Sequence, residues 1–68
     1  MHAIDRCYFR LHRAGWSIGE VRITAAGGPA WFVTGTNGEN VIEARAATQT
    51  AAWENACRQA EGLGMLRR

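Results

Sequence analysis

Arginine is the residue type in this sequence best suited to binding chemistry, because all eight lysine-or-arginine positions are arginine. A planar guanidinium donates two parallel hydrogen bonds to a phosphate or a carboxylate. At about 100° per residue, a helix expected over residues 2–14 carries a basic stripe roughly 80° wide. The stripe consists of His2, Arg6, Arg10 and Arg13, with the aromatic Phe9 beside it.

Phosphate contacts from arginine together with a stacking aromatic are typical of nucleic-acid binding. The candidate nucleic-acid contacts are therefore Arg6, Phe9, Arg10 and Arg13. The alternative is that this stripe is an ordinary solvated helix face and that the arginines reflect a GC-rich genome. The net charge of only +2 favours this alternative, since nucleic-acid binders usually carry a larger excess.

A second candidate surface lies in the strand-like middle of the chain, on the side of a predicted sheet that faces water. It consists of Arg22, Phe32, Thr34, Val41 and Arg45. Arginine on such a face reads guanine in some DNA-binding domains. Three carboxylates, Glu20, Glu39 and Glu43, share or border the face and would repel phosphates. The mixture therefore fits a protein contact or a dimer interface better.

Groups that could support catalysis or hold a metal are sparse. The two histidines, His2 and His12, fall on different sides of the first predicted helix, with no carboxylate spaced to orient either ring. No carboxylate pair, glycine-rich phosphate loop or CxxC spacing occurs. Cys7 and Cys57 are too few for a disulfide framework, and we expect both as buried free thiols in helices. The sequence thus predicts a non-catalytic protein without a cofactor or a metal.

Length and composition indicate one small domain over residues 1–68. The chain is 47% hydrophobic and 21% charged, which is a globular composition. No apolar run approaches the roughly 20 residues that a membrane helix needs, and no signal-peptide core follows Met1. We therefore expect a soluble, cytoplasmic protein that does not associate with membranes.

The first helix and the first strand follow from hydrophobic spacing. Ile4, Cys7, Tyr8 and Leu11 recur at helical spacing, and Gly15 suits the position just past a helix end. From Trp16 the period becomes two. The pair Val21 and Ile23 is out of phase with Trp16 and Ile18, so a bulge near Gly19–Glu20 is predicted to bring all four to one face.

A hairpin is predicted where two strand-like runs, 31–36 and 39–46, flank Asn37-Gly38. That pair suits a two-residue type I′ turn, which places Thr36 opposite Glu39 and Thr34 opposite Val41. Directly opposed residues share a face. The predicted core side is Trp31, Val33, Ile42 and Ala44, and the outer side is Phe32, Thr34, Val41, Glu43 and Arg45.

A second helix is predicted to begin at the N-cap residue Thr48 and to end at Gly62 or Gly64. Its buried stripe is Ala52, Trp53, Ala56, Ala60 and Leu63, with Cys57 at the edge. Met65 and Leu66 are expected to pack back on the core. The resulting fold class is α+β: a two-layer sandwich in α-β-β-β-α order, with a three-stranded antiparallel sheet and both helices on one face.

This order resembles the double-stranded-RNA-binding domain. Gly28-Pro29 lies between the first two predicted strands, where that family often has Gly-Pro, and Phe32 and an alanine-rich second helix follow. The resemblance implies the fold and an RNA contact through the first helix. Two other contact regions depart from the family: Ala30-Trp31 replaces a histidine, and the uncharged segment 48–52 replaces a lysine cluster.

A shorter stretch is similar to the strand-to-helix junction of HicB-like antitoxins. It runs from Ala47-Thr48 through Trp53-Glu54-Asn55-Ala56 to Ala60. Taken together, the residues predict a module that interacts with another protein or with itself. Weak, salt-sensitive binding of double-stranded RNA or DNA through the first helix is the alternative.

Overall fold

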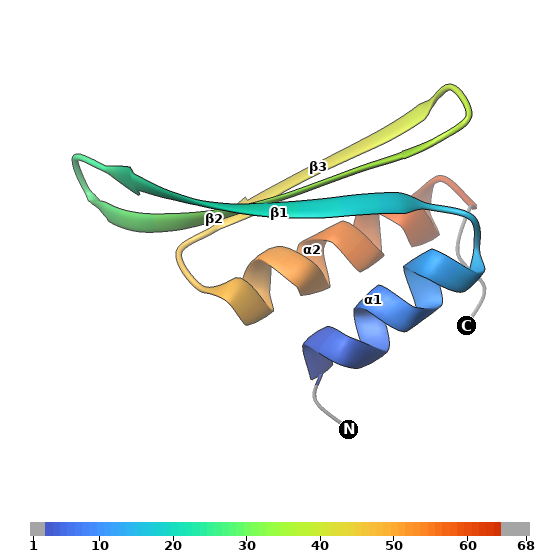
Figure 1. Ribbon diagram of the computed structural model, residues 1–68, viewed down its shortest axis with the longest axis horizontal. Helices are drawn as coiled ribbons and strands as arrows, with labels where there is room; N and C mark the ends of the chain where they lie inside the picture. The colour runs from blue at the N-terminus through green and yellow to red at the C-terminus, as the bar shows by residue number, and fades with distance from the viewer. Residues whose placement is uncertain (1–2, 65–68) are drawn as a thin grey trace.

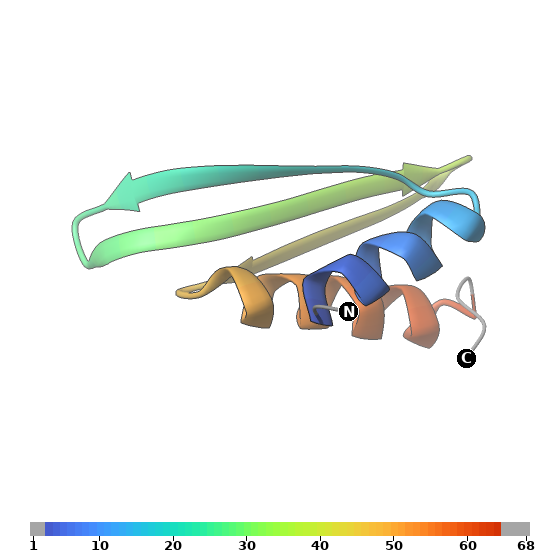
Figure 2. The same cartoon turned by 60° about the horizontal axis from the view of Figure 1, so that its bottom comes forward.

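The computed structural model describes residues 3–64 and has two layers, a sheet and a pair of helices (Figures 1 and 2). The elements are α1 (Ala3–Arg13), β1 (Ser17–Ala25), β2 (Gly28–Asn37), β3 (Asn40–Ala46) and α2 (Gln49–Gly62). The strands form one antiparallel sheet in the order β1-β2-β3. Both helices lie against the same face of this sheet. The α+β fold predicted from the sequence is confirmed.

Two groups of sequence predictions lie outside the described residues. His2 of the basic stripe is one, and the packing of Met65 and Leu66 is the other. Within the described part of the chain, no helix combines the length and the apolar character that crossing a membrane requires.

Helix α1 ends in a Schellman motif, as its glycine predicts. Gly15 adopts a φ of 95°, a conformation that glycine reaches without the cost of a Cβ. The Trp16 amide donates to the Leu11 carbonyl over 3.0 Å, and the Gly15 amide donates to His12 over 3.1 Å. These bonds satisfy carbonyls that the helix end would leave unpaired. They also turn the chain so that Trp16 and Leu11 both enter the core.

Strand β1 has no bulge, and the prediction of one near Gly19–Glu20 is wrong. Its pairing with β2 runs without interruption from Ser17 opposite Thr36 to Ala25 opposite Gly28. Strict alternation therefore places Val21 on the open face of the sheet, where it is 59% exposed. It also places Glu20 and Arg22 on the side of the helices, opposite Val33 and Trp31.

The helix side accepts these two charged residues because each finds a partner there. The Glu20 carboxylate accepts hydrogen bonds from Trp53 Nε1 at 3.1 Å and from Gln49 Nε2 at 2.8 Å. The Arg22 guanidinium lies 5.7 Å from the centre of the Trp31 ring, within the range of a cation–π interaction. Arg22 therefore does not lie on the open face, and its prediction as a contact residue of that face is wrong.

The β2–β3 hairpin exists as predicted, but its register is shifted by two residues. Asn37 lies opposite Asn40, and Gly38 and Glu39 form the loop. Gly38 has a φ of 64° and occupies the first loop position, where a type II′ turn favours glycine. The Asn37 side chain donates instead to the Ala14 carbonyl over 3.0 Å, which ties this hairpin end to the end of α1.

The predicted faces of β2 and β3 survive this change because a shift of two preserves the alternation. Val33, Ile42 and Ala44 are buried at 0%, 1% and 2% exposure. Trp31 packs against the same core while staying partly exposed.

Helix α2 begins as predicted, with the Thr48 hydroxyl accepting a hydrogen bond from the Ala51 amide over 3.2 Å. Its buried residues are Ala52, Trp53, Ala56, Cys57 and Ala60. Leu63, expected in this stripe, is the C-cap residue and is 50% exposed. The small alanines let α2 lie close beneath β2 and β3.

A disulfide joins Cys7 of α1 to Cys57 of α2, with 6.1 Å between the two Cα atoms. The expectation of two free thiols is therefore wrong. Each cysteine was placed correctly on the apolar side of its helix, and both are 6% exposed. The bond forms because α1 and α2 pack side by side with these faces in contact.

Candidate interaction surfaces

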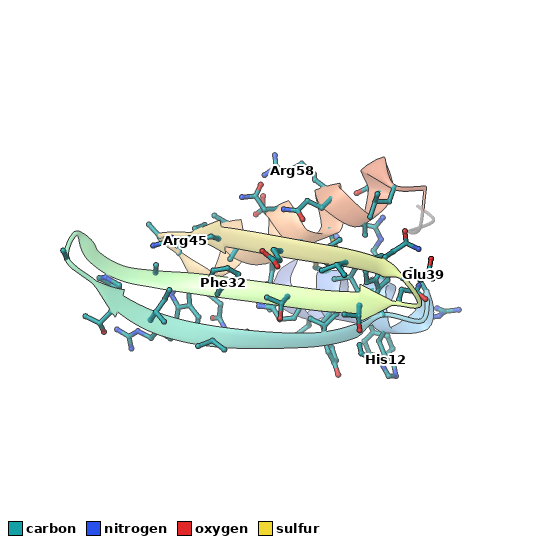
Figure 3. All side chains as sticks on the ribbon, turned by 90° about the horizontal axis from the view of Figure 1, so that it is seen from above. His12, Phe32, Glu39, Arg45 and Arg58 are labelled. Atoms are coloured by element: carbon teal, nitrogen blue, oxygen red, sulfur yellow. A yellow bond between two sulfur atoms is a disulfide. The ribbon has the colours of Figure 1, made fainter. Side chains whose placement is uncertain are left out.

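No helix or loop of the described structure covers the open face of the sheet (Figure 3). Pairing across the three strands sorts its residues into rows. One row is Val21, Phe32 and Arg45; the next is Gly19, Thr34 and Glu43; the third is Ser17, Thr36 and Val41. Phe32 thus lies on the central strand between an apolar neighbour on β1 and a cation on β3, as Figure 3 shows for Phe32 and Arg45.

The apolar part of this face is larger than the sequence indicated. Val21 is 59% exposed and Val41 is 57% exposed, while Phe32 and Ile23 are partly buried by their neighbours. Val21 and Ile23 replace Arg22 on this face, and they were missed because a bulge was assumed. Uninterrupted alternation starting from Trp16 would have found both.

The charges on the open face are balanced. Arg45 and Glu43 lie two positions apart on β3 and therefore point the same way. Glu20, expected to share or border this face, instead bonds to Gln49 and Trp53 on the helix side. A face with one cation, one anion and an apolar centre lacks the positive potential that attracts a phosphate backbone. This mixture of charges and apolar residues is more typical of a face that contacts another protein.

The basic stripe of α1 lies on the side of that helix away from the core. Arg6 and Arg13 are exposed, and Phe9 is 56% exposed. Arg10 instead lies 3.8 Å from the Glu61 carboxylate of α2. The structure therefore presents Arg6, Phe9 and Arg13 together to solvent, while Arg10 belongs to a contact between the helices.

A hollow of about 370 Å³ lies between the two helices, above the disulfide. Its lining carries charges of both signs: Arg6, Arg10 and Arg58 with Glu54 and Glu61, around Cys7 and Cys57. Within residues 3–64, no three histidine, cysteine or acidic side chains cluster as ligands for a metal ion.

The two edges of the sheet differ. At the β3 edge, the Gln59 side chain of α2 forms two hydrogen bonds with the backbone of Glu43. Figure 3 shows α2, with Arg58 labelled, extending past β3 on this side, whereas β1 forms the opposite edge. The side-chain amide of Gln59 thus lies at the β3 edge and bonds to its backbone.

No protein-family model matches the chain, and neither the curated proteins nor the solved structures contain a match.

Proposed function

We propose that this chain is a non-catalytic interaction module that binds protein through the open face of its sheet. The observation that carries the proposal is the apolar centre of that face, where Val21, 59% exposed, lies directly opposite Phe32, and Ile23 and Ala30 form the next row. Burying such a centre inside a polar rim is the usual construction of a protein interface.

Self-association is the first form of binding to measure, because burying this face also stabilises so small a domain. Phe32→Glu places a charge at the centre of the face and is expected to abolish the rise of mass with concentration in sedimentation equilibrium. Phe9→Glu makes the same chemical change at an exposed aromatic on α1 and serves as the matched control. A wild-type chain that remains monomeric at millimolar concentration contradicts the proposal.

Nucleic-acid binding through α1 is the second candidate function, favoured by the exposure of Arg6, Phe9 and Arg13 on one helix. The shared element order with the double-stranded-RNA-binding domain supports it. Phosphate contacts release counterions, so affinity for duplex RNA or DNA should fall steeply with salt.

The test of this second function is a titration at low and high salt with two charge-matched variants. Arg6→Glu/Arg13→Glu should lose binding, whereas Arg45→Glu/Arg58→Glu, with the same net charge, should retain most of it. Affinity that is independent of salt, or equal loss in both variants, excludes α1 as the contact surface.

The cellular compartment is part of this proposal. The Cys7–Cys57 disulfide favours an oxidising compartment over the cytoplasm expected from the sequence, since cytoplasmic thiols are kept reduced. Alkylation of the protein directly in cells, followed by mass measurement, distinguishes the oxidised from the reduced form.

A further inference from the structure

At the β3 edge of the sheet, the Gln59 side chain bonds to the backbone of Glu43 as a neighbouring strand would. Gln59 Nε2 donates to the Glu43 carbonyl over 2.6 Å, and the Glu43 amide donates to Gln59 Oε1 over 3.0 Å. A carboxamide offers the same donor and acceptor pair as a peptide group. It therefore occupies the position that an added strand would take at this edge.

The same two bonds establish which backbone groups of β1 face outward. Because the groups of Glu43 point away from β2, Thr34 and Glu43 form a non-hydrogen-bonded pair, and such pairs alternate along a ladder. Carried across β2, the alternation turns the N–H and C=O groups of Ile18, Glu20, Arg22 and Thr24 away from the sheet. Pro29, which has no N–H, lies opposite Thr24 and fits this pattern.

The β1 edge has no counterpart of Gln59. Within residues 3–64, no hydrogen bond from another segment reaches the outward backbone groups of residues 18–24. Residues 19–22 are exposed. A nine-residue strand with outward donors and acceptors is a template for one more strand.

We propose that this edge pairs antiparallel with β1 of a second copy of the chain, with Val21 opposite Val21 of that copy. This inference rests on the proposed function only in that the chain is an interaction module, and it names a second copy as the partner of the β1 edge. A two-fold axis at the strand centre joins the two sheets into one of six strands. Both pairs of helices then lie on the same side of it.

The charges of β1 select this register. Among the two-fold pairings that match outward groups to outward groups, those centred on Glu20, Val21 or Arg22 overlap the most residues of β1. Centring on Glu20 places two carboxylates directly opposite each other, and centring on Arg22 does the same with two guanidinium groups. Centring on Val21 places Glu20 of each copy opposite Arg22 of the other, which forms two attractive pairs.

The shape of the molecule accommodates the same arrangement. Register about Val21 sets Ser17 opposite Ala25 of the second copy, so the α1 end of each copy lies beside the β1–β2 hairpin of the other. That hairpin extends beyond both helices of its own chain (Figures 1 and 2). Val21, 59% exposed in one chain, becomes a valine–valine contact, and the two open faces become continuous.

Charge reversal tests this pairing. Glu20→Arg and Arg22→Glu each convert two attractive pairs into two repulsive ones, so each variant alone should dimerise on the order of ten-fold more weakly than wild type. Mixed in equal amounts, the two variants regain opposite charges at every pair and should form a heterodimer. Sedimentation of each variant and of the mixture measures both effects, with circular dichroism to confirm folding.

A second measurement needs no variant. In the dimer, the amides of Glu20 and Arg22 donate across the new edge, so their hydrogen exchange should slow as the wild-type concentration rises. Amides that stay fast at concentrations where the protein is dimeric overturn the inference.

The two proposals fail in different ways. Association that is lost in Phe32→Glu but unchanged by both charge reversals overturns the β1 pairing and leaves the open face as the binding surface. Association that weakens in both charge reversals and is unchanged in Phe32→Glu supports the β1 pairing and overturns self-association through the open face.

Discussion

The two faces of the sheet are built from the same three strands and differ in nearly every other respect. On the helix side, Val33 and Ile42 are at most 1% exposed, whereas on the open side Val41 is 57% exposed. Val41 and Ile42 are adjacent in the chain and have similar chemistry. Their different burial comes from what lies above each face, since helices cover one and solvent covers the other.

This comparison teaches that apolar residues serve two purposes in one small sheet. Those beneath the helices stabilise the fold, because their surface leaves water when the chain folds. Those on the open face contribute little to folding and remain available for binding. Substitutions at matched positions on the two faces separate the two purposes.

The largest expected effect comes from shortening neighbouring residues of β3. Ile42→Ala should lower the free energy of unfolding by about 2–5 kcal/mol, because it leaves a cavity in a close-packed core. Val41→Ala, the control on the open face, should change it by no more than about 0.5 kcal/mol. Urea denaturation measures both, and equal losses would show that the open face is also part of the folding core.

Reducing the disulfide is expected to have the next largest effect, because it releases the two helices that close the covered face. The bond closes a loop with a sequence separation of 50 residues. Its loss should lower the free energy of unfolding by about 2–4 kcal/mol. Wild type with and without a thiol reductant, compared with Cys7→Ala/Cys57→Ala, gives the measurement. Coincident denaturation curves for the oxidised and reduced protein would contradict this expectation.

The smallest effect is expected from two glycines on opposite faces. A Cβ at Gly35 would collide with the Ile18 side chain and lie 3.3 Å from Ile42 Cγ1, whereas a Cβ at Gly19 meets nothing within 4 Å. Gly35→Ala should therefore destabilise by about 1–3 kcal/mol. Gly19→Ala should stabilise by up to about 1 kcal/mol, because alanine restricts the unfolded chain. Thermal unfolding distinguishes the opposite signs, and a loss of stability in both variants would contradict the contrast.

The sequence predicted the ends of elements correctly where a single residue type favours the required backbone conformation or cap. Gly15 ends α1, and Thr48 begins α2 through its own hydroxyl. The turn between β2 and β3 was predicted in the right place but with the wrong pairing. Asn37 suits a turn by itself, yet its side chain bonds to Ala14, 23 residues away, and that contact keeps it in the strand.

The candidate surfaces were predicted only in part. Phe32, Thr34, Val41 and Arg45 lie on the open face as expected, because a shift of two residues leaves the alternation unchanged. Arg22 lies on the other side. Hydrophobicity favoured turning Val21 inward, and only the positions of Trp31 and Trp53 show that Arg22 and Glu20 have partners beneath the sheet.

The sequence by itself determined the order of the elements, the ends of both helices and the buried side of β2 and β3, because each depends on residues close together in the chain. The tertiary structure alone decided the uninterrupted alternation of β1, the Cys7–Cys57 disulfide and the contact of Gln59 with the β3 edge. Each of these depends on residues far apart in sequence, whose distances are set only when the helices pack beneath the sheet.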